Sequence, residues 1–229
     1  MKSLASLTAS AIAVALVSAA DGAMIAGWSI TTAFPTGTGN VPTGNTYSVG
    51  VADQGEQTGG SSLSSYHALA AATYTSPSGN GSQYAFSSNN WSSGDYYEAR
   101  VSTSNYSNIS VSWDQARSST GPAAFELVFS TDNGASWITV TSYTVLQSGG
   151  GGAPGTWTST TYNAIYTNNR ALAGAEDASL LIIRFRSLAT GAATGSNRID
   201  NVNISGDLVP APGAVALLAV ASLVSRRRR

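Results

Sequence analysis

Short alternations of apolar and polar residues recur between residues 24 and 208, and they predict an all-β domain. The run ISVSW at 109–113 alternates strictly, while Leu181, Ile183 and Phe185 share one face of a second run. No segment between these limits has a sustained helical period. Each strand can bury only alternate residues, so two sheets must face each other. We therefore expect about eight to eleven short strands in a jelly-roll-like antiparallel β-sandwich.

Composition narrows the function of this domain. Residues 24–207 hold six Arg and no Lys against eleven Asp plus Glu, a net charge of −5. The region therefore lacks the basic patch that nucleic-acid binding requires. The chain has no Cys and a single His, which excludes thiol chemistry and Cys-based zinc sites. A surface rich in Ser, Thr, Asn and Gly is typical of an extracellular β-domain.

The N-terminal segment has the order of a secretion signal. Lys2 precedes an apolar run over residues 4–20, and the small residues Ser18, Ala19 and Ala20 form its exit. We expect residues 1–23 to be a signal helix that is removed on export. The alternatives are a buried helix and an uncleaved anchor.

The C-terminal segment indicates a second membrane contact. Its entry is Val209-Pro210-Ala211-Pro212-Gly213, followed by an apolar run and then Arg226, Arg227, Arg228 and Arg229. An apolar segment closed by a basic cluster is a stop-transfer pattern. As a helix, residues 213–224 would span only about 18 Å of a roughly 30 Å hydrocarbon core. This short hydrophobic helix predicts transient anchoring, with a permanent tail anchor as the alternative.

Residues 209–229 resemble the PEP-CTERM sorting signal of Gram-negative bacteria. Val209, Pro210, Pro212 and Gly213 form the entry, and the terminal arginines form the basic end; Ala211 replaces the usual Glu between the prolines. The resemblance implies secretion machinery and an exosortase-type membrane protease as partners. It also implies delivery to the cell surface or an exopolysaccharide matrix. The expected organisation is a signal at 1–23, a β-sandwich domain at 24–208 and a sorting tail at 209–229.

One motif suggests a structural hairpin. Ser130, Asp132, Gly134 and Trp137 match the Ser-x-Asp-x-Gly-x-x-Trp pattern, which is similar to hairpins of sialidase-type propellers. The Asp can bond backbone amides in the turn, and the Gly accepts a positive φ. A propeller needs several copies, and this chain has one. We therefore predict a structural hairpin rather than a glycosidase blade.

Catalytic groups are sparse. His67 is the only imidazole and falls in an Ala/Ser-rich stretch, so we expect a solvated loop histidine. A glycosidase needs two carboxylates, and the close pairs are Asp95 with Glu98 and Glu176 with Asp177. We predict no catalytic residue, with a carbohydrate-active enzyme that uses such a pair as the alternative.

Asp200 is a candidate for a buried ion pair or for calcium. It has the parity of Val202 and Ile204, so we expect it on the core side, where a carboxylate needs a partner. That partner could be Arg100 or Arg198, or a calcium ion held with carbonyl and amide oxygens. The sequence Ile-Asp-Asn-Val at 199–202 resembles the last strand of extracellular jelly-roll modules, including carbohydrate-binding ones.

Aromatic residues near loops could stack on sugar rings or could pack into the core; they are Trp91, Tyr96, Trp157, Tyr162 and Tyr166. Together these patterns favour an exported, non-catalytic surface or matrix protein that could hold polysaccharide. The alternatives are the carboxylate enzyme and a structural or adhesive protein without a small-molecule ligand. No cofactor is expected beyond calcium.

Overall fold

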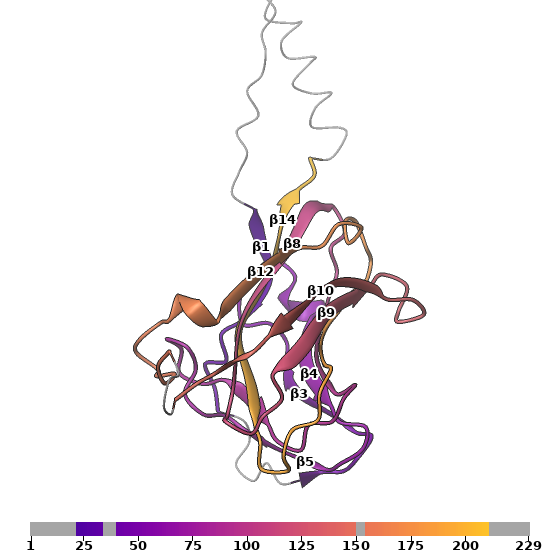
Figure 1. Cartoon of the computed structure of the whole chain (residues 1–229). Coiled ribbons are helices and arrows are strands. Elements are labelled where there is room, and N and C mark those ends of the chain that lie inside the picture. Colours follow the sequence, from indigo (N-terminus) through magenta and orange to yellow (C-terminus); the bar gives the residue numbers. More distant parts are fainter. Residues whose placement is uncertain (1–21, 34–39, 150–153, 211–229) are drawn as a thin grey trace, which may run out of the picture.

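The protein is a two-sheet β-sandwich in a computed structural model that describes residues 22–33, 40–149 and 154–210 (Figure 1). Two short 3-10 turns, η1 (Thr58–Gly60) and η2 (Ala164–Tyr166), are the helical elements of these residues. The all-β prediction is confirmed. Of the signal helix expected at residues 1–23, only Gly22 and Ala23 are described, and Ala23 begins strand β1. The expected C-terminal helix lies outside the described residues.

One sheet has eight strands. The order β11-β8-β14-β6-β5-β2 forms its path, while β1 pairs with β14 and β12 pairs with β8. All of these pairs are antiparallel except β11 with β8. The strands are β1 (Ala23–Trp28), β2 (Asn40–Val41), β5 (Ala72–Thr75), β6 (Phe86–Ser88), β8 (Tyr106–Arg117), β11 (Leu146–Gln147), β12 (Thr167–Ala171) and β14 (Asn197–Leu208).

The other sheet has six strands in the order β10-β9-β13-β7-β4-β3, so β3 forms one edge. Every pair in this sheet is antiparallel. The strands are β3 (Thr46–Gly50), β4 (Ser62–Tyr66), β7 (Tyr96–Val101), β9 (Ala124–Ser130), β10 (Ile138–Thr144) and β13 (Leu181–Ser187).

The core lies between the sheets and is rich in aromatic rings. Trp113 from the larger sheet contacts Phe185 from the smaller one, with ring centroids 4.9 Å apart. Trp91 packs edge-on against Tyr97 and Phe125 at 4.9 and 5.6 Å. Burying each such ring contributes about 1.5–3 kcal/mol. A disulfide-free domain can therefore fold on its core alone.

The two ends of the sandwich lie side by side. Ala23 at the start of β1 is the register partner of Gly206 near the end of β14. Figure 1 shows both strands at the same end of the molecule. Within the described ranges, no helix has the length and apolar character needed to cross a bilayer.

Candidate functional site

A polar hollow of about 350 Å³ lies on the outer face of the larger sheet. We call it the polar cleft. Polar side chains of the central strands and of the loops beside them dominate its lining, among them Ser112, Asp114, Thr167, Asn201 and Asn203, with Tyr162 at its side. Asp114 is its one charged lining residue.

A bulge in β14 creates the floor of this cleft. Asp200 is the register partner of Asp114 and Asn203 is that of Ser112, with a shift between them. Asn201 absorbs the extra residue with φ 47°, a conformation that Asn tolerates better than most residues. The bulge breaks the alternation, so Asp200 faces the same side as Asp114 and not the core side. The expected orientation of Asp200 is wrong for this reason.

Asp114 is held by side-chain donors on both carboxylate oxygens. Thr167 Oγ1 donates to Oδ1 at 2.5 Å, and the amides of Asn80 and Asn201 donate to Oδ2 at 3.0 and 2.8 Å. Asp114 is only 1% exposed. The carboxylate is thus a fixed acceptor that orients the polar groups around it.

Asn80 joins the loop before β6 to the loop before β12. Its side-chain oxygen accepts from Asn163 N at 2.9 Å, and its Nδ2 donates to Asn163 O at 3.0 Å. Its backbone oxygen accepts from Asn201 Nδ2 at 3.1 Å. One buried amide therefore fixes both loops to the sheet.

Tyr162 stands beside the cleft and is 55% exposed. Its hydroxyl is 2.5 Å from Thr167 Oγ1, which itself donates to Asp114. A Cβ at Gly81 would lie 2.9–3.0 Å from the Cβ and backbone of Tyr162, and Gly81 has φ 76°. The glycine lets the loop approach closely enough to support the ring.

Asp200 is fully buried behind the cleft. Its Oδ2 accepts from Asn80 N at 2.8 Å and from Ser82 Oγ at 2.5 Å, while its Oδ1 has no hydrogen-bond partner. Burial is the main cause that raises its pKa to about 6, and the charge of Asp114 adds to the shift. This carboxyl therefore titrates near pH 6, above the range of an ordinary aspartic acid.

The partners predicted for Asp200 are engaged elsewhere. Arg100 Nε pairs with Glu98 at 2.6 Å, and Arg198 donates to Ser78 O and Ser148 Oγ at 3.1 and 2.7 Å. No described guanidinium forms an ion pair with Asp200.

The residues around Asp200 do not fit a calcium site well. Three of the four carboxylate oxygens of Asp114 and Asp200 already accept N–H or O–H donors. Calcium instead needs six to eight oxygen ligands. In the described part of the chain, no cluster of three or more His, Asp or Glu residues is placed to hold a metal.

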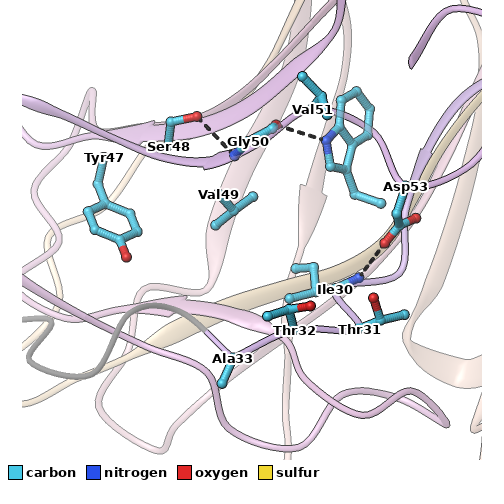
Figure 2. Close-up of a pocket in the computed structure, with 11 residues that line it drawn as sticks. Ile30, Thr31, Thr32, Ala33, Tyr47, Ser48, Val49, Gly50, Val51 and Asp53 are labelled. Carbon is cyan, nitrogen blue, oxygen red and sulfur yellow. Dashed lines mark hydrogen bonds between the residues drawn. The ribbon is translucent and has the colours of Figure 1, made fainter. Parts of the chain in front are cut away.

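A larger groove of about 680 Å³ runs along the edge strand β3. Figure 2 shows residues 47–51 along one wall and residues 30–33 along the other, with Asp53 near one end. Asp53 accepts from Ser29 N and from Ile30 N at 3.1 Å each. Ile30 has φ 49°, which is rare for a β-branched residue. We call this hollow the edge groove.

The candidate carboxylate pairs do not converge on a site. Asp95 points inward to His67 at 3.1 Å, whereas Glu98 lies on the outer face and binds Arg100 and Arg184 at 2.6 and 2.7 Å. Glu176 accepts from Gly174 N and Asp177 accepts from Asn105 N. These last two carboxylates stabilise turns.

His67 is buried, which corrects the prediction of a solvated loop residue. It is 2% exposed, and its Nε2 lies 3.2 Å from Ser88 Oγ while its Nδ1 lies 3.1 Å from Asp95 Oδ2. This is the order of a Ser-His-Asp relay. Ser88 is 1% exposed and Asp95 is fully buried, and none of these residues lines a described hollow. A substrate therefore has no route to the serine, and the group is structural.

The five aromatic residues divide between core and surface. Trp91, Trp157 and Tyr166 are at most 3% exposed. Tyr96 is half-buried, with Tyr66 stacked at 5.4 Å and the Arg184 guanidinium 3.9 Å from its ring. Because neighbours cover the ring of Tyr96, it offers little to a sugar. Tyr162 is the exposed aromatic side chain among the described residues.

The hairpin motif lies between β9 and β10. Ser130 Oγ donates to Asp132 Oδ1 at 2.7 Å, and Trp137 Nε1 donates to Gly134 O at 3.1 Å. Hydrogen bonds from Ser136 and then Ser130 lower the pKa of the exposed Asp132 carboxyl below its usual range. Gly134 has φ 86°. Of the sorting-signal residues, Val209 and Pro210 end the described chain, and Pro212, Gly213 and the four arginines lie outside it.

No protein-family model and no curated protein matches the chain. Solved structures do resemble it. One is the CBM22-1–GH10 part of a Clostridium thermocellum endo-1,4-β-D-xylanase with xylohexaose, at 14% identity and TM-score 0.45, matching 79% of this chain and 28% of that one.

A second is the CBM22-1 xylan-binding domain of a Paenibacillus barcinonensis protein, at 12% identity and TM-score 0.41, matching 83% of this chain and 97% of that one. A third is an adhesin domain of Lys-gingipain, at 11% identity and TM-score 0.41, matching 70% of this chain and 99% of that one.

Proposed function

We propose that this chain is an exported, non-catalytic surface or matrix protein whose jelly-roll-like sandwich binds glycan in the polar cleft. The observation that carries the proposal is Tyr162, an exposed ring held beside a set of fixed amide, hydroxyl and carboxylate groups. An aromatic face packs against the C–H groups of a sugar, while amides and carboxylates bond its hydroxyls. Export and sorting rest on the terminal sequence patterns.

The geometry favours binding over hydrolysis. Asp114 is the one carboxylate that lines the cleft, and its two oxygens already accept three side-chain donors. A glycosidase places one carboxyl group as an acid and a second as a base or nucleophile on either side of the scissile bond. Asp200 lies behind the cleft and does not line it. The lining of the cleft therefore lacks the second carboxyl group that hydrolysis requires.

The test is glycan binding by purified protein, first on an array of neutral and acidic polysaccharides and then by calorimetry. Tyr162→Ala should weaken binding by about fivefold or more, because stacking contributes about 1 kcal/mol beyond burial. Ile165→Ala is the matched control, since Ile165 is 56% exposed nearby and does not line the cleft. Equal affinities for the two variants, or no binding by the wild type, would contradict the proposal.

A further inference from the structure

The polar cleft and the edge groove share one wall. Ser29 and Gln54 line the cleft, while their chain neighbours Ile30 and Asp53 line the groove. The two hollows therefore lie on opposite sides of a single ridge formed by residues 29–30 and 53–54.

The ridge is rigid and polar. Gly27 N donates to Gln54 O at 2.9 Å, and Asp53 N donates to Gly27 O at 2.9 Å. Gln54 Nε2 donates to Ser29 Oγ at 3.0 Å, and the Asp53 carboxylate holds Ser29 and Ile30. Asp53 and Gln54 are exposed and Ser29 is half-exposed. A ligand that crosses the ridge would meet a hydroxyl, a carboxylate and an amide.

The two hollows differ in chemistry. The cleft is lined mainly by amides and hydroxyls, whereas the groove has the apolar side chains Val49 and Val51 together with Tyr47. Ile30 is held there at φ 49° by its bond to Asp53. Strain of this kind is retained at sites where the surrounding structure requires it.

The charged residues that line the two hollows restrict the charge class of the ligand. Asp114 is the one charged residue that lines the cleft and Asp53 the one that lines the groove, so neither lining includes Lys or Arg. An anionic chain would meet no cation in either lining, would face the exposed Asp53 carboxylate in the groove and would lie over the buried Asp114 carboxylate in the cleft. A neutral chain avoids this repulsion and can use the exposed Asp53 carboxylate as a hydrogen-bond acceptor.

We propose that the edge groove extends the polar cleft across the ridge of residues 29–30 and 53–54, so that the site takes several units of a neutral, linear polysaccharide. The cleft holds one part of the chain by hydrogen bonds and by Tyr162. The groove holds the continuing part against Val51 and its apolar wall. This inference rests on the proposed function and adds the length and charge class of its ligand.

The test measures affinity against chain length, with neutral linear oligosaccharides from the disaccharide upward and a uronic-acid polysaccharide as the anionic probe. The wild type should bind longer neutral chains more tightly and the anionic chain weakly. Val51→Ser should weaken the affinity for long chains by roughly fivefold and leave the affinity for short chains unchanged, because it removes apolar contact only in the groove. Leu69→Ser is the control, since Leu69 is 75% exposed and lines neither hollow.

A second variant, Thr32→Arg, places a long charged side chain in the groove without adding an aromatic face for a sugar, and it should also remove the chain-length dependence. If chain length still raises affinity in both groove variants, the groove is not part of the site, although binding in the cleft stands. Tighter binding of the anionic chain would overturn the charge class. If no chain binds and Tyr162→Ala changes nothing, the proposed function itself fails.

Discussion

Asn80 joins the carboxylates of Asp114 and Asp200, because its side-chain amide donates to the first at 3.0 Å and its backbone N–H donates to the second at 2.8 Å. The two acids are also register partners across β8 and β14. Burial raises the pKa of Asp200, and the neighbouring charge of Asp114 adds to that shift.

The pH dependence of stability should therefore show a component of opposite sign to that of most acidic residues. The folded-state pKa of Asp200, about 6, lies above the ordinary aspartic acid value of 3.8. Its contribution is fully present below the unfolded pKa and is lost as pH rises through about 6. We expect a loss of about 2–3 kcal/mol in unfolding free energy over this window.

Asp200→Asn should remove that component, since Asn keeps an acceptor for Asn80 and Ser82 and cannot ionise. Urea unfolding of both proteins between about pH 4 and pH 7.5 measures the difference. The same dependence on pH in the variant would show that another group is responsible.

Metal removal tests the calcium alternative. The donors that already occupy the carboxylates of Asp114 and Asp200 predict an unchanged Tm on adding EDTA or excess calcium. A rise in Tm with calcium that is absent in Asp200→Asn would instead show that the ion binds there.

The buried group around His67 should be essential for stability but not for any hydrolysis. Asp95 accepts from Ala68 N at 2.9 Å and from Ser92 N at 2.6 Å in addition to its contact with His67. Asp95→Ala should lower the unfolding free energy by about 3 kcal/mol or more, because it leaves buried partners unpaired.

Ser88→Ala is the milder comparison and should cost about 1–2 kcal/mol, because Ser88 Oγ contacts His67 Nε2 at 3.2 Å and the Tyr97 hydroxyl at 3.5 Å. Neither the wild type nor either variant should hydrolyse esterase substrates. Hydrolysis by the wild type that Ser88→Ala abolishes would show that the relay is catalytic.

Removal of residues 209–229 should release the sandwich into the medium, because the stop-transfer segment and its arginines would be lost. Cell fractionation with intact-mass analysis follows both ends of the chain at once. Replacement of the four terminal arginines by Ala is a narrower variant. Unchanged retention in the envelope after the deletion would contradict the sorting proposal.

Local alternation was enough to predict the sandwich, because burial on one face imposes a period of two on each strand. The inward rows of β8 and β13, with Trp113 and Phe185, follow directly from it. Alternation fails where a strand has a bulge. The orientation of Asp200 depends on φ 47° at Asn201, which no period reveals.

The cleft itself was beyond sequence reasoning because its parts come from distant segments. Asn80 meets Asp114 across 34 positions and Asn163 across 83. His67 is buried because Asp95, 28 positions later, folds back onto it. The available signal was weak: Asp114 is the one acidic residue of β8, and Tyr162 was one of five aromatic candidates.

The pairing of Ala23 with Gly206 means that the polypeptide enters and leaves the sandwich at neighbouring positions. A fold built this way can be placed within a surface loop of an unrelated host with little distortion of either partner. The sandwich should also tolerate circular permutation, in which a short linker joins the start of β1 to the end of β14 and the chain is opened in another loop. The sandwich is therefore suited to insertion into other proteins by engineering.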